Sequence, residues 1–237
     1  MASSRGFELV HGIVDSLWLS KPGAALEDFR RVCVELGREL ELPIGFEGRY
    51  RWIVFLNSKV DPRVPVLNRY YGVLEDGTVK VRGIELRRHD TPGIVNRCQA
   101  GMLGVLGRAR NSFEFKALVP EALSVLGSYV EMVRERRVPL EELLIAKNLS
   151  KNPDEYSKLV PQAIAAKLLA KEGGRVHAGQ RVDFVLTRKK GAIPGELVDG
   201  NLVYDWERYR ELLISSAESL LLPFGYDRDI LGKIVST

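Results

Sequence analysis

Residues 7–19 read FELVHGIVDSLWL, with short apolar runs on either side of a glycine-containing centre. This pattern predicts a β-hairpin with Asp15 near its tip. A carboxylate at such a tip can hold a divalent cation where strands converge, although an Asp that only accepts hydrogen bonds from turn amides is more frequent. The spacing by itself leaves the role of Asp15 open.

The residues after the hairpin predict further strands and one helix. Apolar side chains recur at the helical intervals of three and four residues, at Leu26, Phe29, Cys33, Leu36 and Leu40. Strands are predicted at residues 44–56, 66–74 and 79–81, with a turn at Asp76-Gly77. Residues 1–90 therefore predict an α+β part, a four-stranded antiparallel sheet with one helix, whose open edge needs covering by another chain.

The rest of the chain predicts mostly helix. Thr91 and Pro92 make a strong helix start, because a capping hydroxyl precedes a proline at the first helical position. Gly173-Gly174 ends a helix that begins near Pro161. The other predicted elements are helices at 92–107, 114–136, 139–146 and 206–221, and a strand at 181–187.

Positive charge is concentrated in one segment. Residues 147–190 contain ten Lys and Arg but four Asp and Glu, whereas the whole chain has a net charge of +4. A localised basic stripe is the electrostatic footprint of a protein that binds a phosphate backbone. A solvated surface face explains such a stripe equally well, so the charge alone leaves both explanations open.

Cysteine content and hydropathy exclude several classes of protein. Cys33 and Cys98 form no CxxC pair, which argues against a structural zinc site and against a secreted disulfide scaffold. The apolar runs are shorter than a transmembrane helix, and the amino terminus lacks the layout of a signal peptide. We therefore expect a cytoplasmic protein without a membrane partner, and the abundance of Arg and Glu leans toward a thermophile.

Several short motifs resemble those of family B DNA polymerases. Residues 11–17 (HGIVDSL) resemble motif C, which usually reads Tyr-Gly-Asp-Thr-Asp-Ser, and residues 68–72 (NRYYG) sit where the family has a Lys-Lys-x-Tyr segment. Residues 81–90 (VRGIELRRHD) resemble the signature at the border of palm and thumb, and residues 149–156 (LSKNPDEY) resemble the thumb stretch Leu-Ser-Lys-x-Pro-x-x-Tyr. The family's order continues with Pro161, with Gly179 before the strand at 182–186, and with residues 224–226.

Each motif is weak alone, but six in the family's order, from about residue 7 to residue 228, are specific. The resemblance implies a partial polymerase palm, an antiparallel sheet with a packed helix, at residues 1–90, and a mostly helical thumb at residues 91–237. It also implies a DNA-directed DNA polymerase. Such an enzyme uses two Mg²⁺ ions, one to activate the primer hydroxyl and one to stabilise the leaving pyrophosphate.

The resemblance also implies site residues. Asp15 matches the second Asp of motif C, so it is expected to be the catalytic metal ligand. Glu47 matches an acidic palm residue near that site, although an ordinary strand Glu explains it equally well. Ser16 is expected near the primer terminus or as a support of the turn. Contacts to the primer–template are expected from Arg69, Tyr70, Arg82, Arg87 and Arg88, although some of these cations are salt-bridge partners instead, Arg88 with Asp90 for instance. In the thumb, backbone phosphates, which carry affinity without sequence readout, are expected to contact Lys147, Lys151, Tyr156 and Arg181.

Three positions depart from the family's pattern. Ile13 replaces the first Asp of motif C, His11 replaces its Tyr, and Asn68 replaces the first Lys of the Lys-Lys segment. The loss of a carboxylate at position 13 either weakens metal binding or marks a degenerate paralogue. The sequence Gly-Ile-Val-Asp resembles a variant of one archaeal branch, which favours an active protein.

The family's exonuclease domain, first palm motif and fingers have no counterpart in this sequence. One carboxylate cannot assemble a two-metal site, so we expect the small subunit of a split polymerase, whose large subunit completes the Mg²⁺ site. The other expected partners are primer–template DNA, deoxynucleotides and a sliding clamp reached through the large subunit, in a nucleoid-associated complex. A cloned fragment of a longer polymerase is compatible with the same sequence.

Two other functions stay open. The first is a catalytically degenerate, non-enzymatic DNA-binding subunit derived from a polymerase, and Ile13 is its main support. The second is a stand-alone nucleic-acid-binding module. Isolation of the chain from its host, with or without a larger companion, separates these alternatives.

Overall fold

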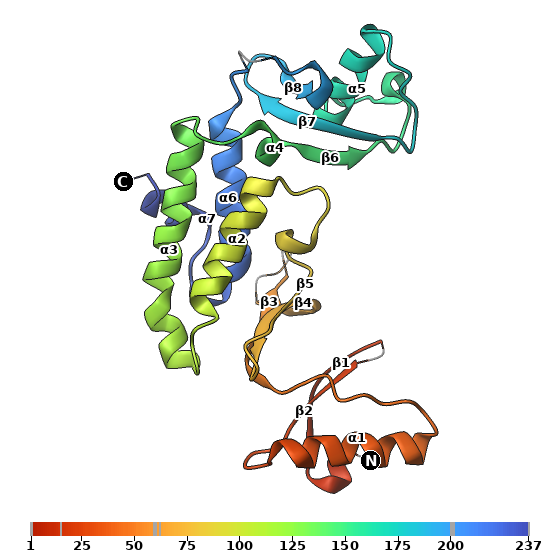
Figure 1. Cartoon of the computed structure of the whole chain (residues 1–237), viewed down its shortest axis with the longest axis vertical. Coiled ribbons are helices and arrows are strands. Elements are labelled where there is room, and N and C mark those ends of the chain that lie inside the picture. The colour runs from red at the N-terminus through yellow and green to blue at the C-terminus, as the bar shows by residue number, and fades with distance from the viewer. Residues whose placement is uncertain (1, 15, 59–60, 62, 200–201, 237) are drawn as a thin grey trace. The chain divides into compact units, whose positions relative to one another are not determined.

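The computed structural model describes residues 2–14, 16–58, 61, 63–199 and 202–236 (Figure 1). The chain divides by its internal packing into two compact units. Unit 1 consists of residues 1–82 and 110–112, and unit 2 of residues 83–109 and 113–237. The predicted assignment of residues 1–90 to a palm and of residues 91–237 to a thumb stays a prediction.

Unit 1 begins with the predicted hairpin, which is confirmed. Strand β1 (Glu8–Ile13) pairs antiparallel with β2 (Ser16–Ser20), and Ile13 lies opposite Ser16. The two apolar runs of residues 7–19 form these strands because alternating side chains reach opposite faces of a strand.

The predicted helix is also confirmed, as α1 (Leu26–Leu40). Asp28 in its first turn accepts a hydrogen bond from the backbone N–H of Ala25 at 2.9 Å, which satisfies one of the free amides of a helix start. The helix buries Val32 and Leu36 against Phe7. This small core holds α1 to the chain that leads into the hairpin.

Three further strands of unit 1 form a separate sheet. They are β3 (Tyr50–Asn57), β4 (Pro65–Leu74) and β5 (Val79–Arg82), in the antiparallel order β3-β4-β5. The predicted four-stranded sheet is therefore wrong, since the described strands form a two-stranded and a three-stranded sheet. Residues 44–49, part of the strand predicted at 44–56, lie before β3 in the structure. Gly45 and Gly48 weaken strand formation there.

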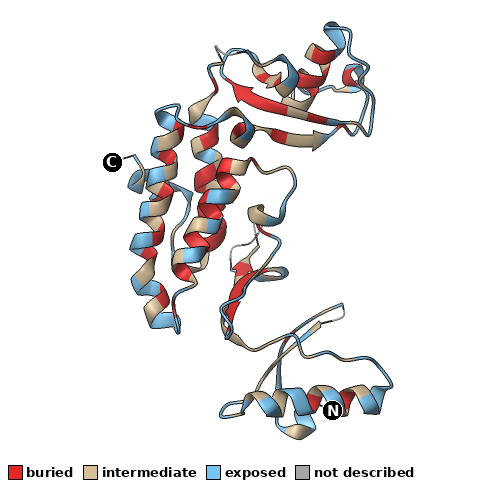
Figure 2. Ribbon diagram, in the orientation of Figure 1, coloured by how far each residue is buried: buried red, intermediate tan, exposed pale blue. Residues whose placement is uncertain are grey.

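The long helices of unit 2 carry its main core. They are α2 (Gly93–Leu106), α3 (Ser112–Arg134) and α6 (Trp206–Leu221), as predicted, followed by α7 (Arg228–Ile234), which the sequence pattern did not reveal. Figure 2 marks buried residues along α2 and α6. Pro92 rather than Thr91 is the N-cap of α2, and no side chain caps it, so the predicted capping hydroxyl is wrong.

A three-stranded antiparallel sheet completes unit 2. Its order is β6 (Ile145–Asn148), β7 (Arg181–Thr187) and β8 (Gly191–Pro194), and α5 (Pro161–Lys171) packs against β7 and β8. The predicted β7 and α5 are confirmed.

The helix predicted at residues 139–146 is wrong beyond the short α4 (Leu140–Leu143). The chain then enters β6, because Ile145 pairs with Phe184 of β7 and both side chains are buried in this sheet. Tyr209 of α6 fixes the junction. Its hydroxyl donates to the carbonyl of Leu143 at 2.7 Å and accepts from the N–H of Leu186 at 3.1 Å.

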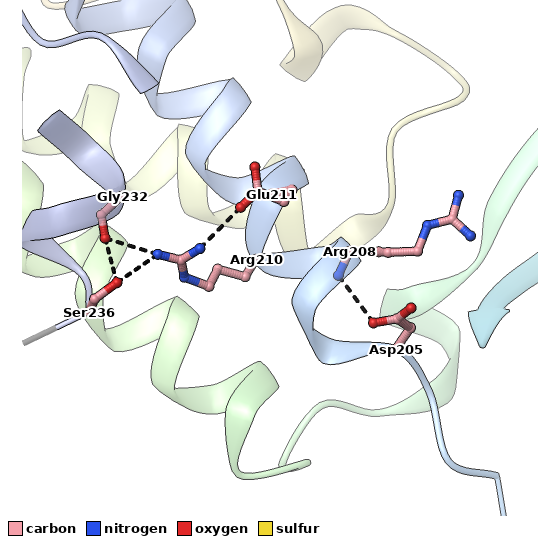
Figure 3. Close-up of polar contacts among 6 residues, drawn as sticks. All are labelled: Asp205, Arg208, Arg210, Glu211, Gly232 and Ser236. Atoms are coloured by element: carbon pink, nitrogen blue, oxygen red, sulfur yellow. Dashed lines mark hydrogen bonds and ion pairs between the residues drawn. The ribbon is translucent and has the colours of Figure 1, made fainter. Parts of the chain in front are cut away.

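Polar contacts along α6 attach the last helix (Figure 3). The Nη2 of Arg210 donates to the carbonyl of Gly232 at 2.9 Å and to the Oγ of Ser236 at 2.8 Å. At the start of α6, the carboxylate of Asp205 accepts from the N–H of Arg208 at 3.3 Å. Within the described ranges, the structure contains no helix with the length and apolar character that spanning a bilayer requires.

Candidate nucleic-acid interface

An aromatic cluster supports the hairpin within unit 1. The buried ring of His11 lies 4.8 Å from the ring centroid of Trp18 and 4.8 Å from that of Phe55. Trp18 meets Tyr70 edge to face at 5.4 Å. His11, which stands where the family has Tyr, therefore packs the hairpin onto β3 and β4.

Among the described residues at the hairpin end, Val14 has a strained backbone. Val14 has a φ of 45°, in the left-handed region, and its side chain is fully exposed. This conformation costs a residue other than glycine about 1–3 kcal/mol, and such strain concentrates at functional sites. Asp15 lies outside the described residues, and Ser16 is half-buried opposite Ile13. The catalytic role of Asp15 and the role of Ser16 stay predictions.

Glu47 is exposed and engaged with a cation. Its Oε1 lies 2.8 Å from the Nζ of Lys80, and this hydrogen bond raises the pKa of Lys80. It lies before β3 and not within a strand. The described residues contain no group of three or more His, Cys, Asp and Glu side chains placed to hold a metal ion. They do not by themselves fit a two-metal site, so the metal role of Glu47 stays a prediction.

The three predicted contacts on β4 and β5 differ in exposure. Tyr70 is only 9% exposed, so its ring serves the aromatic cluster. Arg69 is half-buried, and its Nη1 donates to the carbonyl of Asn57 at 3.1 Å. Arg82 ends β5, opposite Tyr70, and is exposed. Of the three, Arg82 presents the most surface to a ligand.

A buried amide holds the segment at residues 83–88. The Nε2 of Gln99 donates to the Oε2 of Glu85 at 3.0 Å and to the carbonyl of Ser216 at 2.8 Å. Its Oε1 accepts from the N–H of Leu86 at 2.7 Å, and the Oγ of Ser219 donates to Glu85 at 3.0 Å. This network fixes Glu85–Arg87 against α2 and α6.

Sequence reasoning missed Gln99. Its partners lie 13, 14 and 117 positions away along the chain, so no local spacing could reveal it.

Two predicted phosphate contacts converge beside this segment. The Nε and Nη2 of Arg88 each lie 2.9 Å from an oxygen of Asp90, and the Nζ of Lys147 lies 3.7 Å from the same carboxylate. The hydrogen bonds from Arg88 lower the pKa of Asp90. Arg87 stands next in sequence and is exposed. The two cations share one acid, so one positive charge is left over.

The loop at residues 149–156 is internally braced. The N–H of Asn152 donates to the Oε2 of Glu155 at 3.0 Å, and its Oδ1 accepts from the N–H of Ala178 at 3.0 Å. The hydroxyl of Tyr156 accepts from the N–H of Ser150 at 2.9 Å. Desolvation would raise the pKa of Tyr156, but the hydrogen bonds from Ser150 and the backbone lower it overall. This bracing presents Lys151 to solvent.

Some cations of residues 147–190 have acidic partners. Lys147 pairs with Asp90, Arg181 with Asp183 at 2.8 Å, and Arg188 with Glu207 at 2.6 Å. The others form no ion pair with any residue that the structure describes: Lys151, Lys158, Lys167, Lys171, Arg175, Lys189 and Lys190. The basic stripe is therefore largely unneutralised, which suits an anionic polymer.

Known proteins match this architecture. The profile described as DNA polymerase family B matches residues 5–220. The DNA polymerase of Archaeoglobus fulgidus is 30% identical over 209 residues, which make up 87% of this chain and 24% of that protein. DNA polymerase 1 of Pyrococcus abyssi is 25% identical over 241 residues, 96% of this chain and 29% of that protein.

A solved structure shares the fold. The family B DNA polymerase from Pyrobaculum calidifontis matches 95% of this chain and 28% of that chain, with a TM-score of 0.66 and 24% identity. The expected fold class, a partial palm with antiparallel strands followed by a mostly helical thumb, is confirmed. This chain spans less than a third of each of these proteins.

Proposed function

Because this chain belongs to DNA polymerase family B, we propose that it is the carboxy-terminal small subunit of a split polymerase. In this proposal it supplies a catalytic aspartate and a surface that grips duplex DNA for template-directed nucleotidyl transfer. A large subunit supplies the exonuclease, the first palm motif and the fingers. The chain matches less than a third of each relative, and the proposal assigns the parts of the polymerase outside this match to the large subunit.

One observation carries the DNA-binding part of the proposal. Arg88 and Lys147 come from distant segments and meet at the carboxylate of Asp90. A phosphate that approaches this pair finds a planar guanidinium and an ammonium already in place, with a single acid between them. Lys151, presented by its braced loop, offers a further contact that carries no sequence readout.

The catalytic part rests on Asp15. In the proposal this residue holds Mg²⁺ together with acidic groups of the large subunit. The metal supplies Lewis acidity at the reacting phosphate, and the residues of this chain hold the duplex in register. The aromatic cluster around His11 supports the hairpin to which motif C corresponds.

Reconstitution tests this function. The chain is purified from its native host, its companion is identified, and both chains are then combined with primer–template, deoxynucleotides and Mg²⁺. We expect a large companion with an exonuclease and fingers, extension by the pair, and none by this chain alone. Recovery of this sequence inside one continuous polymerase would refute the split, and a pair without extension would refute the polymerase.

A non-enzymatic DNA-binding subunit is the second candidate. It is favoured by Ile13, which stands where the family has a carboxylate, and by the ion pair of Glu47 with Lys80. An assembled complex that binds duplex DNA in a salt-sensitive manner, without extension, would support this candidate.

A further inference from the structure

The turn between β7 and β8 presents three consecutive cations. Thr187 pairs with Gly191, so Arg188, Lys189 and Lys190 form the connection, and all three are exposed. Gly191 has a φ of 76°, the left-handed conformation that ends a three-residue hairpin loop. The backbone thus fixes three positive charges within one tight turn.

Neighbouring elements add charge to this turn. The Nη1 of Arg208 donates to the carbonyl of Gly191 at 3.1 Å, and its side chain points away from Asp205 (Figure 3). A Cβ on Gly191 would lie 2.9 Å from Ile164, and Lys167 follows one helical turn later on α5. We name the set Lys167, Arg188, Lys189, Lys190 and Arg208 the turn patch.

Few acids oppose the turn patch. Glu207 pairs with Arg188, and Asp205 caps α6 through the N–H of Arg208. Lys167, Lys189 and Lys190 form no ion pair with a residue that the structure describes. Five cations against two acids leave a local excess of positive charge, which releases counterions when phosphates take their place.

The turn patch lies at the far end of β7 from Arg181 and the loop at residues 149–156. Arg181 begins this strand of 7 residues, beside the braced loop at residues 149–156, and Thr187 ends it. A rise of about 3.3 Å per residue separates the two ends by about 20 Å. Duplex DNA rises about 3.4 Å per base pair, so this distance corresponds to about six base pairs.

We propose that the turn patch is a second phosphate-binding site, which holds the backbone of duplex DNA about six base pairs from the contact of the 149–156 loop. The proposal rests on the proposed function, because the duplex is the primer–template of that function. Two contacts at this separation resist tilting of the duplex better than one, and neither reads sequence.

Duplex length tests the turn patch. In the assembled complex, Lys189→Gln/Lys190→Gln is compared with the unmodified protein on hairpin duplexes of about 4 base pairs, too short to reach both contacts, and of about 20 base pairs. We expect the variant to lose about three- to tenfold in affinity on the long duplex and to bind the short one unchanged. The salt dependence on the long duplex should fall by about two released counterions.

A matched variant controls for net charge. Lys116→Gln/Lys233→Gln removes two charges from α3 and α7 and should keep its long-duplex affinity within about twofold. Equal losses on both duplexes, no loss, or an equal loss in the control would overturn the turn patch while leaving the proposed function intact. An unmodified complex that binds no duplex would overturn both.

Discussion

Unit 1 and unit 2 differ in how much of their own apolar surface they bury (Figure 2). In unit 1 the hairpin leaves Leu9 and Leu17 more than half exposed, and a two-stranded hairpin is marginal by itself. In unit 2, Met102 of α2 and Leu213 of α6 are completely buried. The difference teaches that the stability of the chain resides mainly in the unit to which we assign the DNA grip, and not in the unit with the proposed chemistry.

The largest expected effect separates catalysis of primer extension from binding of duplex DNA. Asp15→Asn in the assembled complex should lower primer extension about a thousandfold or more, because the proposal makes Asp15 a metal ligand, while duplex affinity stays nearly unchanged. Single-turnover extension and equilibrium binding measure the two effects. Asp76→Asn, in an exposed turn of unit 1, keeps an acceptor for the N–H of Thr78 and should extend normally. Full extension by Asp15→Asn would end the catalytic assignment.

The next effect tests where the stability lies. Leu106→Ala removes a side chain with no exposed surface from α2 and should cost about 2–5 kcal/mol of unfolding free energy. Leu17→Ala, on the exposed face of the hairpin, should cost less than about 0.5 kcal/mol. Denaturant unfolding of the chain measures both. Comparable losses at the two sites would remove the contrast between the units.

A smaller loss is expected at Gln99. Gln99→Ala leaves the carboxylate of Glu85, the N–H of Leu86 and the carbonyl of Ser216 without this partner, at a cost of about 1–3 kcal/mol. Thermal unfolding checks the loss. Gln162→Ala, a half-buried position on α5, is the matched control and should change little. An unchanged unfolding temperature in Gln99→Ala would show that the network adds nothing to unit 2.

The smallest effect concerns acid stability. Hydrogen bonds from Arg88 lower the pKa of Asp90 from its ordinary 3.8, so the pair stabilises unit 2 above that pH and loses its contribution as pH falls through the lowered pKa. Asp90→Asn should therefore flatten the decline of unfolding temperature below about pH 4, by an amount typical of a partly exposed pair, up to about 1 kcal/mol. Asp154→Asn, at an exposed site, should keep the decline of the unmodified protein.

The elements predicted correctly are those whose apolar periodicity is visible in a short stretch of sequence. The hairpin, α1 and α6 follow from periodic apolar residues, and residues 81–90 marked the segment that carries Arg87 and Arg88. Strand β6 was mistaken for helix because Ile145 is a strand residue only through its pairing with Phe184. The meeting of Lys147 with Asp90 likewise depends on tertiary packing.

Gly83, between β5 and the docked turn at Glu85, has a φ of 66°, which a residue with a side chain adopts at a cost of about 1–2 kcal/mol. It follows directly after Arg82, where unit 1 gives way to unit 2. The chain therefore passes from unit 1 into unit 2 through a residue whose backbone conformation favours glycine. For recombination between relatives, a donor segment joined at this position should retain the glycine, because another residue would carry that backbone strain.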